Sequence, residues 1–240
     1  MAVILSKQIV MPVMGKPASD FAIGDSVFLN VNGVPTEFLV VHQGNPDAAL
    51  YDASCEGTWL LMKDIYERGI WDENNENDYE NSDIHPYLNG TFLDLFDADI
   101  KTQIKQVTLP YHKGLGNSGS VASGVNGLST KVFLLSGSEL GWSTNGAYRF
   151  PVDGAKLSYF ESGTGTSANN KRIAYQSGSA FRWWTRSPHI SYNYNVWQCE
   201  DDGTYDYYEA QSAACGYRPA LILPYDALFN PDTNELVGVG

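Results

Sequence analysis

FRWWTRSPHISYNYNVWQCEDDGTYDYYEAQSAACGYRPALILP, residues 181–224, is the stretch on which the interpretation of the whole chain depends. Ten of the 37 residues from Phe181 to Tyr217 are aromatic, against 13% of the whole chain. After Pro188 the rings alternate with Ser, Asn, Asp and Gly, whereas a hydrophobic core would place Leu, Ile and Val between them. Rigid amphipathic rings among small polar residues are typical of a binding surface. The alternative is the outward row of an antiparallel sheet, because Tyr is a good strand former.

The same stretch separates into a predicted surface and a predicted scaffold. The turn formers Asp201, Asp202 and Gly203 allow the chain to fold back on itself. We therefore expect one exposed face to hold Tyr192, Asn193, Tyr194, Tyr205, Tyr207 and Tyr208. The residues beside apolar strands and prolines are expected to be buried scaffold: Trp183, Trp184, Arg186, Arg218 and Pro219.

Composition limits the class of partner. With 28 acidic and 15 basic side chains the formal charge is −13, so the chain repels polyanions and a nucleic-acid partner is not expected. The 240 residues suffice for one large domain or two small ones, and we expect one. The apolar runs at the N-terminus are short and interrupted by Lys7, which predicts neither a secretory signal nor a membrane span.

Residues 1–20 show no hydrophobic period and end in Pro17, Ala18 and Ser19, so we expect an N-terminal arm followed by a domain over 21–240. The three cysteines, Cys55, Cys199 and Cys215, match no zinc spacing and no complete disulfide framework. A Cys199–Cys215 bridge stays open, and synthesis in a reducing cytosol is the expectation.

Short apolar runs in the first third predict strands. SVFLNV and VPTEFLVVHQ flank Asn32-Gly33, a dipeptide that favours a tight hairpin turn, and residues 58–62 (TWLLM) predict a buried strand. Residues 71–83 hold six acids and no base. Asp72, Asn74, Glu76 and Asp78 alternate as calcium ligands can, but the EF-hand glycine and terminal glutamate are missing, so a solvated acidic loop without metal is the expectation.

Helical periodicity is confined to the middle of the chain. Apolar residues recur over 84–96 after the N-cap residue Ser82, with a break at Asn89-Gly90 left open, and a second pattern runs over 98–107. Residues 113–130 predict a long surface loop, and 131–136 a strand whose Ser136 caps a turn through Glu139. The prediction is an α+β fold with mixed or antiparallel sheets, two main helices and long loops.

Motifs of the common enzymes are missing from the sequence. There is no nucleophile elbow, phosphate-binding loop, zinc-protease motif or dinucleotide fingerprint. The four histidines, at 42, 85, 112 and 189, form no pair at metal-binding spacing. Cys215 would be a nucleophile only with a base beside it, which sequence does not reveal. We expect neither a cofactor nor catalysis.

Several motifs resemble one known family. RWWTRSP (182–188), VWQCEDDG (196–203) and GYRPALILP (216–224) resemble the C-terminal region of the variable proteins of diversity-generating retroelements. HQGNP (42–46), YDASCEGTWLLMKDIY (51–66), YENSDIHPYLNGTF (79–92) and KVFLLSGSELG (131–141) are similar to the same proteins of gut bacteria and their phages. The resemblance covers residues 20–224, and WWTRSP and GYRPA are its most specific parts.

The resemblance implies a C-type lectin fold of the formylglycine-generating-enzyme subtype, with a face near the C-terminus that adenine-directed mutagenesis diversifies. In this family AAC codons are randomised at their adenines. They reach Asn, Tyr, Ser, His, Asp and Cys but not Trp, Gln or Glu, so Trp197, Gln198, Glu200, Glu209 and Gln211 fit framework better. The ring-rich run nevertheless includes Trp197, and the implied ligand-binding set is His189, Ser191, Tyr192, Asn193, Tyr194, Asn195, Trp197, Cys199, Tyr205, Asp206, Tyr207 and Tyr208.

The implied function is a hypervariable, non-enzymatic receptor-binding protein, associated with a phage tail or made in the cytoplasm without a signal peptide. Its ligand would be a host-surface protein or glycan, with no membrane insertion. Residues 1–20 would dock on a larger virion protein or on further copies of the chain. Two alternatives stay open. One is an oxidase of the formylglycine-generating type, which needs a copper-binding pair such as Cys199 and Cys215, and the other is a non-variable carbohydrate-binding or structural virion module.

Overall fold

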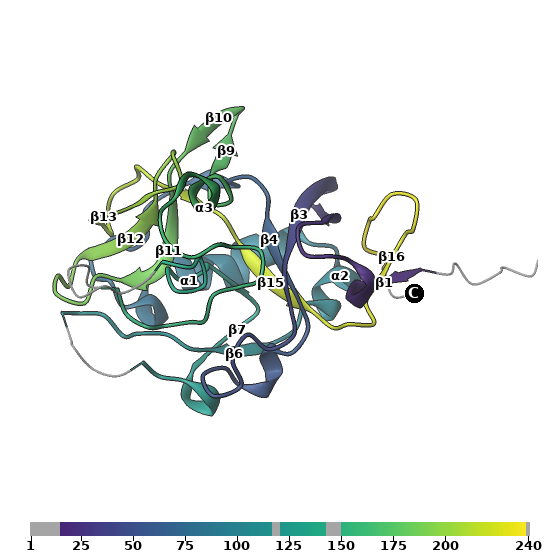
Figure 1. Ribbon diagram of the computed structural model, residues 1–240, viewed down its shortest axis with the longest axis horizontal. Helices are drawn as coiled ribbons and strands as arrows, with labels where there is room; N and C mark the ends of the chain where they lie inside the picture. The colour runs from purple at the N-terminus through teal and green to yellow at the C-terminus, as the bar shows by residue number, and fades with distance from the viewer. Residues whose placement is uncertain (1–14, 117–120, 143–149, 239–240) are drawn as a thin grey trace, which may run out of the picture.

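The computed structural model describes residues 15–116, 121–142 and 150–238. Over these residues the fold is α+β, built mostly of strands with few and short helices (Figure 1). The strands are β1 (Lys16–Pro17), β2 (Ser26–Val31), β3 (Val34–Gln43), β4 (Thr58–Met62), β5 (Glu67–Arg68), β6 (Val107–Leu109), β7 (Leu128–Thr130), β8 (Val132–Phe133), β9 (Ala174–Gln176), β10 (Ser179–Phe181), β11 (Trp183–Pro188), β12 (Asn195–Cys199), β13 (Tyr205–Glu209), β14 (Gly216–Tyr217), β15 (Ala220–Leu223) and β16 (Leu228–Phe229). The α-helices are α1 (Ile84–Tyr87), α2 (Ala98–Gln103) and α3 (Thr166–Asn170).

The two largest sheets in the described residues have five strands each. The first has the order β2-β3-β4-β15-β8 and is antiparallel throughout. Its β2–β3 hairpin turns at Asn32 (φ 51°) and Gly33 (φ 76°), which confirms the hairpin predicted from that dipeptide. The second sheet has the order β13-β12-β11-β14-β5 and contains one parallel pair, β11 with β14. The prediction of mixed and antiparallel sheets is therefore confirmed.

The core lies on both faces of these strands. Successive residues of a strand point to opposite faces, so Leu60 and Leu61 of β4 belong to different hydrophobic clusters, as do Trp183 and Trp184 of β11. The two clusters therefore share the strands that separate them, and together they form the interior of one body.

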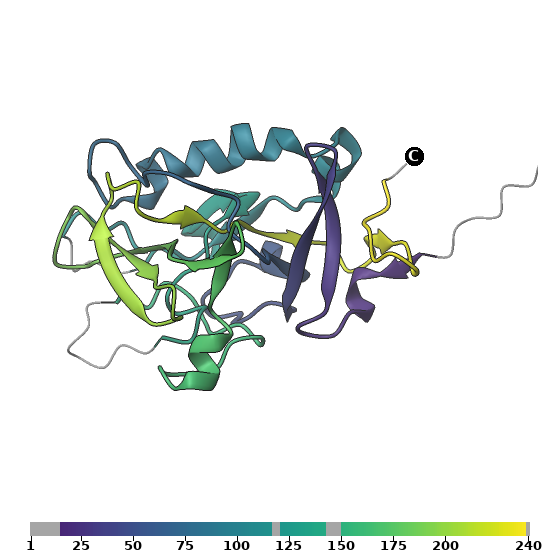
Figure 2. The same cartoon turned by 90° about the horizontal axis from the view of Figure 1, so that it is seen from above.

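One long helical segment lies along one side of the sheets (Figure 2). It begins with α1, continues as a π-helix over Leu88–Phe92 and ends in a 3₁₀ turn over Leu93–Leu95. A break at Asn89-Gly90 would therefore be wrong. The segment stays helical and widens there, and Asn89 Nδ2 donates to the carbonyls of His85 (3.0 Å) and Val132 (2.9 Å). The Asn89 side chain thus ties the helical segment to β8.

The region after this segment differs from the prediction. The helical pattern was expected to run to Val107, but α2 ends at Gln103. Val107 instead begins β6, which pairs with β7. The expected surface loop over 113–130 is thus partly wrong, since Leu128–Thr130 is a strand and Gly124–Asn126 a 3₁₀ turn, while residues 117–120 lie outside the described part.

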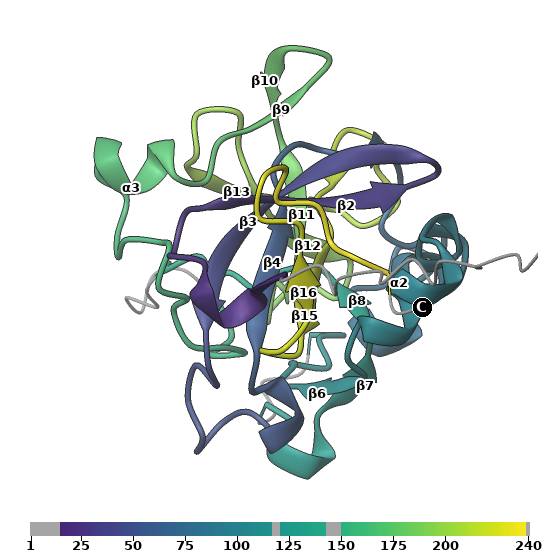
Figure 3. The same cartoon turned by 90° about the vertical axis from the view of Figure 1, so that its right-hand side faces the viewer.

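The boundary of the expected arm is also wrong. Lys16 and Pro17 pair with β16, and Ala18 is fully buried, so residues 16–20 belong to the body of the protein. Residues 1–14 lie outside the described part of the chain. The β1–β16 pair and β13 lie at opposite ends of the molecule (Figure 1). Figure 3 views the molecule from the β1–β16 end. Within the described residues no helix has the length and apolar character needed to span a bilayer.

Candidate ligand-binding face

The β12–β13 hairpin places the second ring-rich segment at a sheet edge. Gly203 takes a positive φ of 80° in its turn, and Glu200 N donates to Thr204 O across the turn at 2.8 Å. The turn predicted at residues 201–203 is confirmed. In the resulting register Trp197 pairs with Tyr207, and β13 is the outermost strand of its sheet.

A buried asparagine fixes the first ring-rich segment, the loop before β12. Asn77 Nδ2 lies 3.1, 2.7 and 2.7 Å from the carbonyl oxygens of His189, Tyr192 and Asn195. Its backbone N–H donates to Asn193 O at 3.0 Å. The sequence does not predict this role, because nothing in the residues around Asn77 points to partners more than 100 residues away.

The two segments meet through their rings. His189 stacks between Tyr192 (4.5 Å between centroids) and Trp197 (5.2 Å). Tyr207 packs edge-on against Trp197 at 5.2 Å, and Tyr192 lies 5.9 Å from Tyr194. Above these buried rings Tyr192, Tyr194, Tyr207 and Tyr208 remain 39–43% exposed. We call the exposed residues Ser191–Tyr194 and Asp206–Glu209 the tyrosine face.

Seven members of the predicted ligand-binding set are exposed: Ser191, Tyr192, Asn193, Tyr194, Asp206, Tyr207 and Tyr208. Tyr205 is half-buried against Trp142 and Phe150. Placing His189, Asn195, Trp197 and Cys199 on the surface is wrong, since at most 6% of each is exposed. The reason is that both faces of β12 are covered, since Val196 packs in one core cluster while Trp197 and Cys199 pack in the other, and the Tyr192 ring covers His189.

The six residues expected on one face are not all on one side of the sheet. Tyr207 and Tyr208 are neighbours in a strand and therefore point to opposite sides of the sheet. On its side, the Tyr208 ring centroid lies 5.6 Å from the guanidinium carbon of Arg182. The two sides meet around the strand edge, where a shallow hollow of about 330 Å³ is lined by Tyr194, Asn195, Tyr207, Tyr208 and Glu209.

The scaffold residues lie beneath this face. Trp183, Trp184, Arg186, Arg218 and Pro219 are all buried, as expected. Arg218 contacts the Trp183 ring (4.9 Å) and donates to Met62 O (2.9 Å), and burial lowers the pKa of its guanidinium to about 10.

A buried ion pair joins β11 to the turn after β8. Arg186 donates to both carboxylate oxygens of Glu139, at 2.6 and 2.7 Å. Burial alone would lower the pKa of Arg186, but Glu139 holds it above its ordinary value. Glu139 also accepts from Ser136 N (2.8 Å) while Ser136 Oγ accepts from Glu139 N (3.1 Å), so the predicted cap at Ser136 is confirmed.

The cysteines do not form the pair left open by the sequence. All three are free and buried, and Cys199 and Cys215 belong to different core clusters. Burial raises the pKa of Cys55 to about 12 and holds the pKa values of Cys199 and Cys215 above their ordinary range. Each thiol therefore stays protonated at neutral pH, which disfavours nucleophilic chemistry.

The acidic loop is only partly solvated, contrary to expectation. Asp72 and Asp78 are buried and accept backbone hydrogen bonds from Glu76 (2.9 Å) and Glu80 (3.2 Å). No group of three His, Cys, Asp or Glu side chains in the described residues is placed to hold a metal ion. The loop flanks the tyrosine face, because Asp72 N donates to Ala210 O (3.0 Å), one residue beyond β13.

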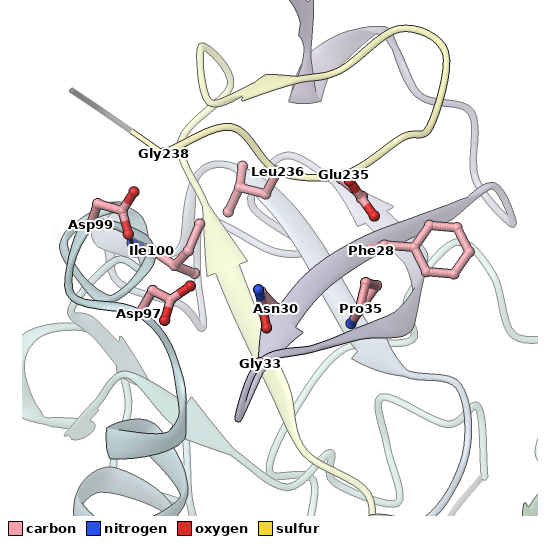
Figure 4. A pocket seen from close by; sticks show the side chains of 10 residues that line it. All are labelled: Phe28, Asn30, Gly33, Pro35, Asp97, Asp99, Ile100, Glu235, Leu236 and Gly238. Carbon is pink, nitrogen blue, oxygen red and sulfur yellow. Dashed lines mark hydrogen bonds between the residues drawn. The ribbon is translucent and has the colours of Figure 1, made fainter.

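A second hollow, of about 280 Å³, lies between the β2–β3 hairpin, α2 and the C-terminal segment (Figure 4). α2 and β13 lie toward opposite ends of the molecule (Figure 1), so this hollow is far from the tyrosine face. The side chains of Asn30, Asp97, Asp99 and Glu235 supply its polar lining. Asp99 is partly engaged, since its Oδ1 accepts from Ile100 N at 2.9 Å.

Comparison with known proteins gives one family match. A family model described as "Domain of unknown function (DUF6273)" matches residues 56–225, more than half of the chain. No curated protein and no solved structure matches the chain.

Proposed function

The chain belongs to the DUF6273 family, and we propose that it is a non-enzymatic ligand-binding protein whose tyrosine face is diversified by a retroelement. The observation that carries the proposal is the arrangement of Tyr192, Tyr194, Tyr207 and Tyr208, four rings about 40% exposed on a fully buried scaffold. Exposed rings gathered on one part of a surface usually mark an interaction site. Tyrosines among Ser, Asn and Asp supply contact area and adaptable hydrogen bonds at low entropic cost.

The finer fold is part of the proposal. We assign the chain to the C-type lectin fold of the formylglycine-generating-enzyme subtype. Mixed sheets, few helices and a ring-rich hairpin near the C-terminus support this assignment.

The proposed ligand is a host-surface protein or glycan, and the proposed place of action is a phage tail. The tyrosine face and the β1–β16 pair lie at opposite ends of the molecule (Figure 1), so one end would face the ligand while the other docks on a larger assembly. The oxidase alternative is weaker because Cys199 and Cys215 are buried in different core clusters.

The experiment that tests this function is sequencing of the DNA that flanks the gene. A retroelement requires a reverse-transcriptase gene and an imperfect repeat of the codons for residues 180–220. We expect both, with the repeat differing from the gene mainly at adenines. Intact flanking DNA with neither element would contradict diversification, and the tyrosine face would then belong to a non-variable binding module.

A further inference from the structure

Building on the proposed binding role of the tyrosine face, we propose that its partner is a basic protein segment. A lysine or arginine side chain of that segment enters the hollow between Tyr194, Tyr207, Tyr208 and Glu209. The proposed function allows either a protein or a glycan as the partner. Here we specify a protein with a basic side chain.

The lining of the hollow suits a cation. Three of its five residues are tyrosines, whose ring faces attract an ammonium or guanidinium group. The exposed carboxylate of Glu209 lies in the same lining and offers a charge-assisted hydrogen bond. A cation would thus find ring faces along its stem and a negative charge at its end.

The chain already holds one of its own guanidinium groups in this way. Arg182 lies 5.6 Å from the Tyr208 ring centroid, and its Nη2 lies 3.6 Å from Glu200 Oε2. A ring and a carboxylate at the edge of this sheet therefore form a place for an arginine. The hollow repeats that combination on the exposed edge of β13, with Glu209 as the carboxylate.

The charge around the hollow is mainly negative. Asp201, Asp202 and Asp206 are exposed near one end of β13. Burial raises the pKa of Glu200, Arg182 opposes that rise, and the three aspartates add to it. The acidic loop lies at the other end, with Glu73 and Glu76 exposed.

The described basic residues near this face are few. Arg182 is engaged by Tyr208 and Glu200, and Lys113 is exposed beside Gly114, which lies against Asn77. Such a field draws a basic partner to the face, repels an acidic one and has little effect on a neutral glycan.

The test uses a displayed library of random short peptides, selected on the full chain. The same selected peptides are then measured against Glu209→Gln, against the double variant Tyr194→Ser/Tyr208→Ser, and against Glu235→Gln. The last variant makes the same change of charge at an exposed position in the distant hollow.

We expect the selected peptides to be enriched in Lys and Arg and to bind more weakly at high salt. Glu209→Gln should weaken binding about tenfold, the double tyrosine variant by more, and Glu235→Gln by less than about twofold. Replacing the essential basic residue of a peptide with glutamine should remove the effect of Glu209→Gln.

Peptides that depend on the tyrosines but carry no basic residue, and that ignore Glu209→Gln, would overturn the inference while supporting the proposed function. Neutral glycans bound through the same tyrosines, with no peptide selected, would also overturn it. Peptides whose affinity is the same for the parent and the double tyrosine variant would count against both proposals.

Discussion

At the scale of single residues, Arg186 links several segments of the buried scaffold through its hydrogen bonds. Besides Glu139 it reaches the carbonyls of Leu134 (2.9 Å), Pro110 (3.2 Å) and Asp153 (3.0 Å). Its side chain and that of Glu139 are completely buried. A buried ion pair adds little net stability, but the loss of one partner leaves a charge that neither water nor protein neutralises.

Arg186→Met should therefore destabilise the protein strongly. We expect the free energy of unfolding to fall by about 3–5 kcal/mol, because Glu139 stays buried without its cation. Arg182→Met is the matched control, since Arg182 is a partly exposed arginine whose pair with Glu200 is worth about 1 kcal/mol or less. Chemical denaturation measures both, and similar losses in the two variants would contradict the assignment of Arg186 to the scaffold.

Asp153 gives the stability a pH dependence. It is fully buried, its Oδ2 accepts from Ser187 Oγ (2.8 Å), and its Oδ1 has no partner within the described residues. Burial raises the pKa of this carboxyl from 3.8 to about 6. Between these values the folded chain keeps a proton that the unfolded chain has released, so this group lowers stability as pH rises from about 4 to 6.

Asp153→Asn should remove that dependence, since the amide has no proton to release. The free energy of unfolding of the variant, minus that of the parent, should increase by about 2–3 kcal/mol between pH 4 and pH 7. Asp226→Asn makes the same chemical change at an exposed aspartate and is the control against which the Asp153→Asn dependence is compared. A flat difference for Asp153→Asn would show that this carboxyl titrates normally in the folded protein.

At the scale of elements, the β12–β13 hairpin depends on the glycine in its turn. A Cβ on Gly203 would lie 2.0 Å from the backbone oxygen of Asn169, at a φ of +80°. Gly178, in the β9–β10 hairpin, has a φ of +82° but nothing within 4 Å of such a Cβ. A side chain at either position would be strained by the positive φ, but only a side chain at Gly203 would also clash with neighbouring atoms.

Gly203→Ala should consequently cost more than Gly178→Ala. The strain common to both is about 1–2 kcal/mol, and the clash with Asn169 adds to it only at Gly203. Denaturant midpoints compare the two variants. A Gly178→Ala loss as large as that of Gly203→Ala would mean that the turn does not pack against α3 as described.

Tyrosines on the face should differ from tyrosines in the core. Tyr194 is 39% exposed, whereas Tyr79 is fully buried and its hydroxyl accepts from Leu134 N at 3.1 Å. Tyr194→Ser should lower the free energy of unfolding by about 1 kcal/mol or less, and Tyr79→Ser by about 3–5 kcal/mol. Thermal melts decide between them, and a large loss from Tyr194→Ser would mean that the face is structural.

What the sequence predicted at this scale depended on local signals. Asn32-Gly33, the Ser136 cap and the turn at 201–203 each act within a few residues, and all three are present. The β6–β7 pair and the Asn77 contacts were missed because their partners are distant in sequence. Exposure in β12 was mispredicted for a related reason, because polar residues alternating with rings do not reveal that distant segments cover both faces of this strand.

At the scale of the whole molecule, the buried core clusters and the exposed tyrosine face occupy different parts of the fold. Both core clusters share the strands of two sheets, whereas the tyrosine face occupies an edge strand and one loop. We expect substitution at Ser191–Tyr194 and Asp206–Glu209 to leave the two core clusters in place, because these residues are exposed and none belongs to either cluster. That separation is what a protein with a changing binding surface requires.

The central claim is a variable face on a fixed scaffold, and sequencing this gene from many members of one population tests it most directly. We expect amino-acid differences to concentrate at Ser191–Tyr194 and Asp206–Tyr208, while Trp183, Trp184, Arg186 and Arg218 stay unchanged. Differences spread evenly along the chain, or an invariant tyrosine face, would contradict it.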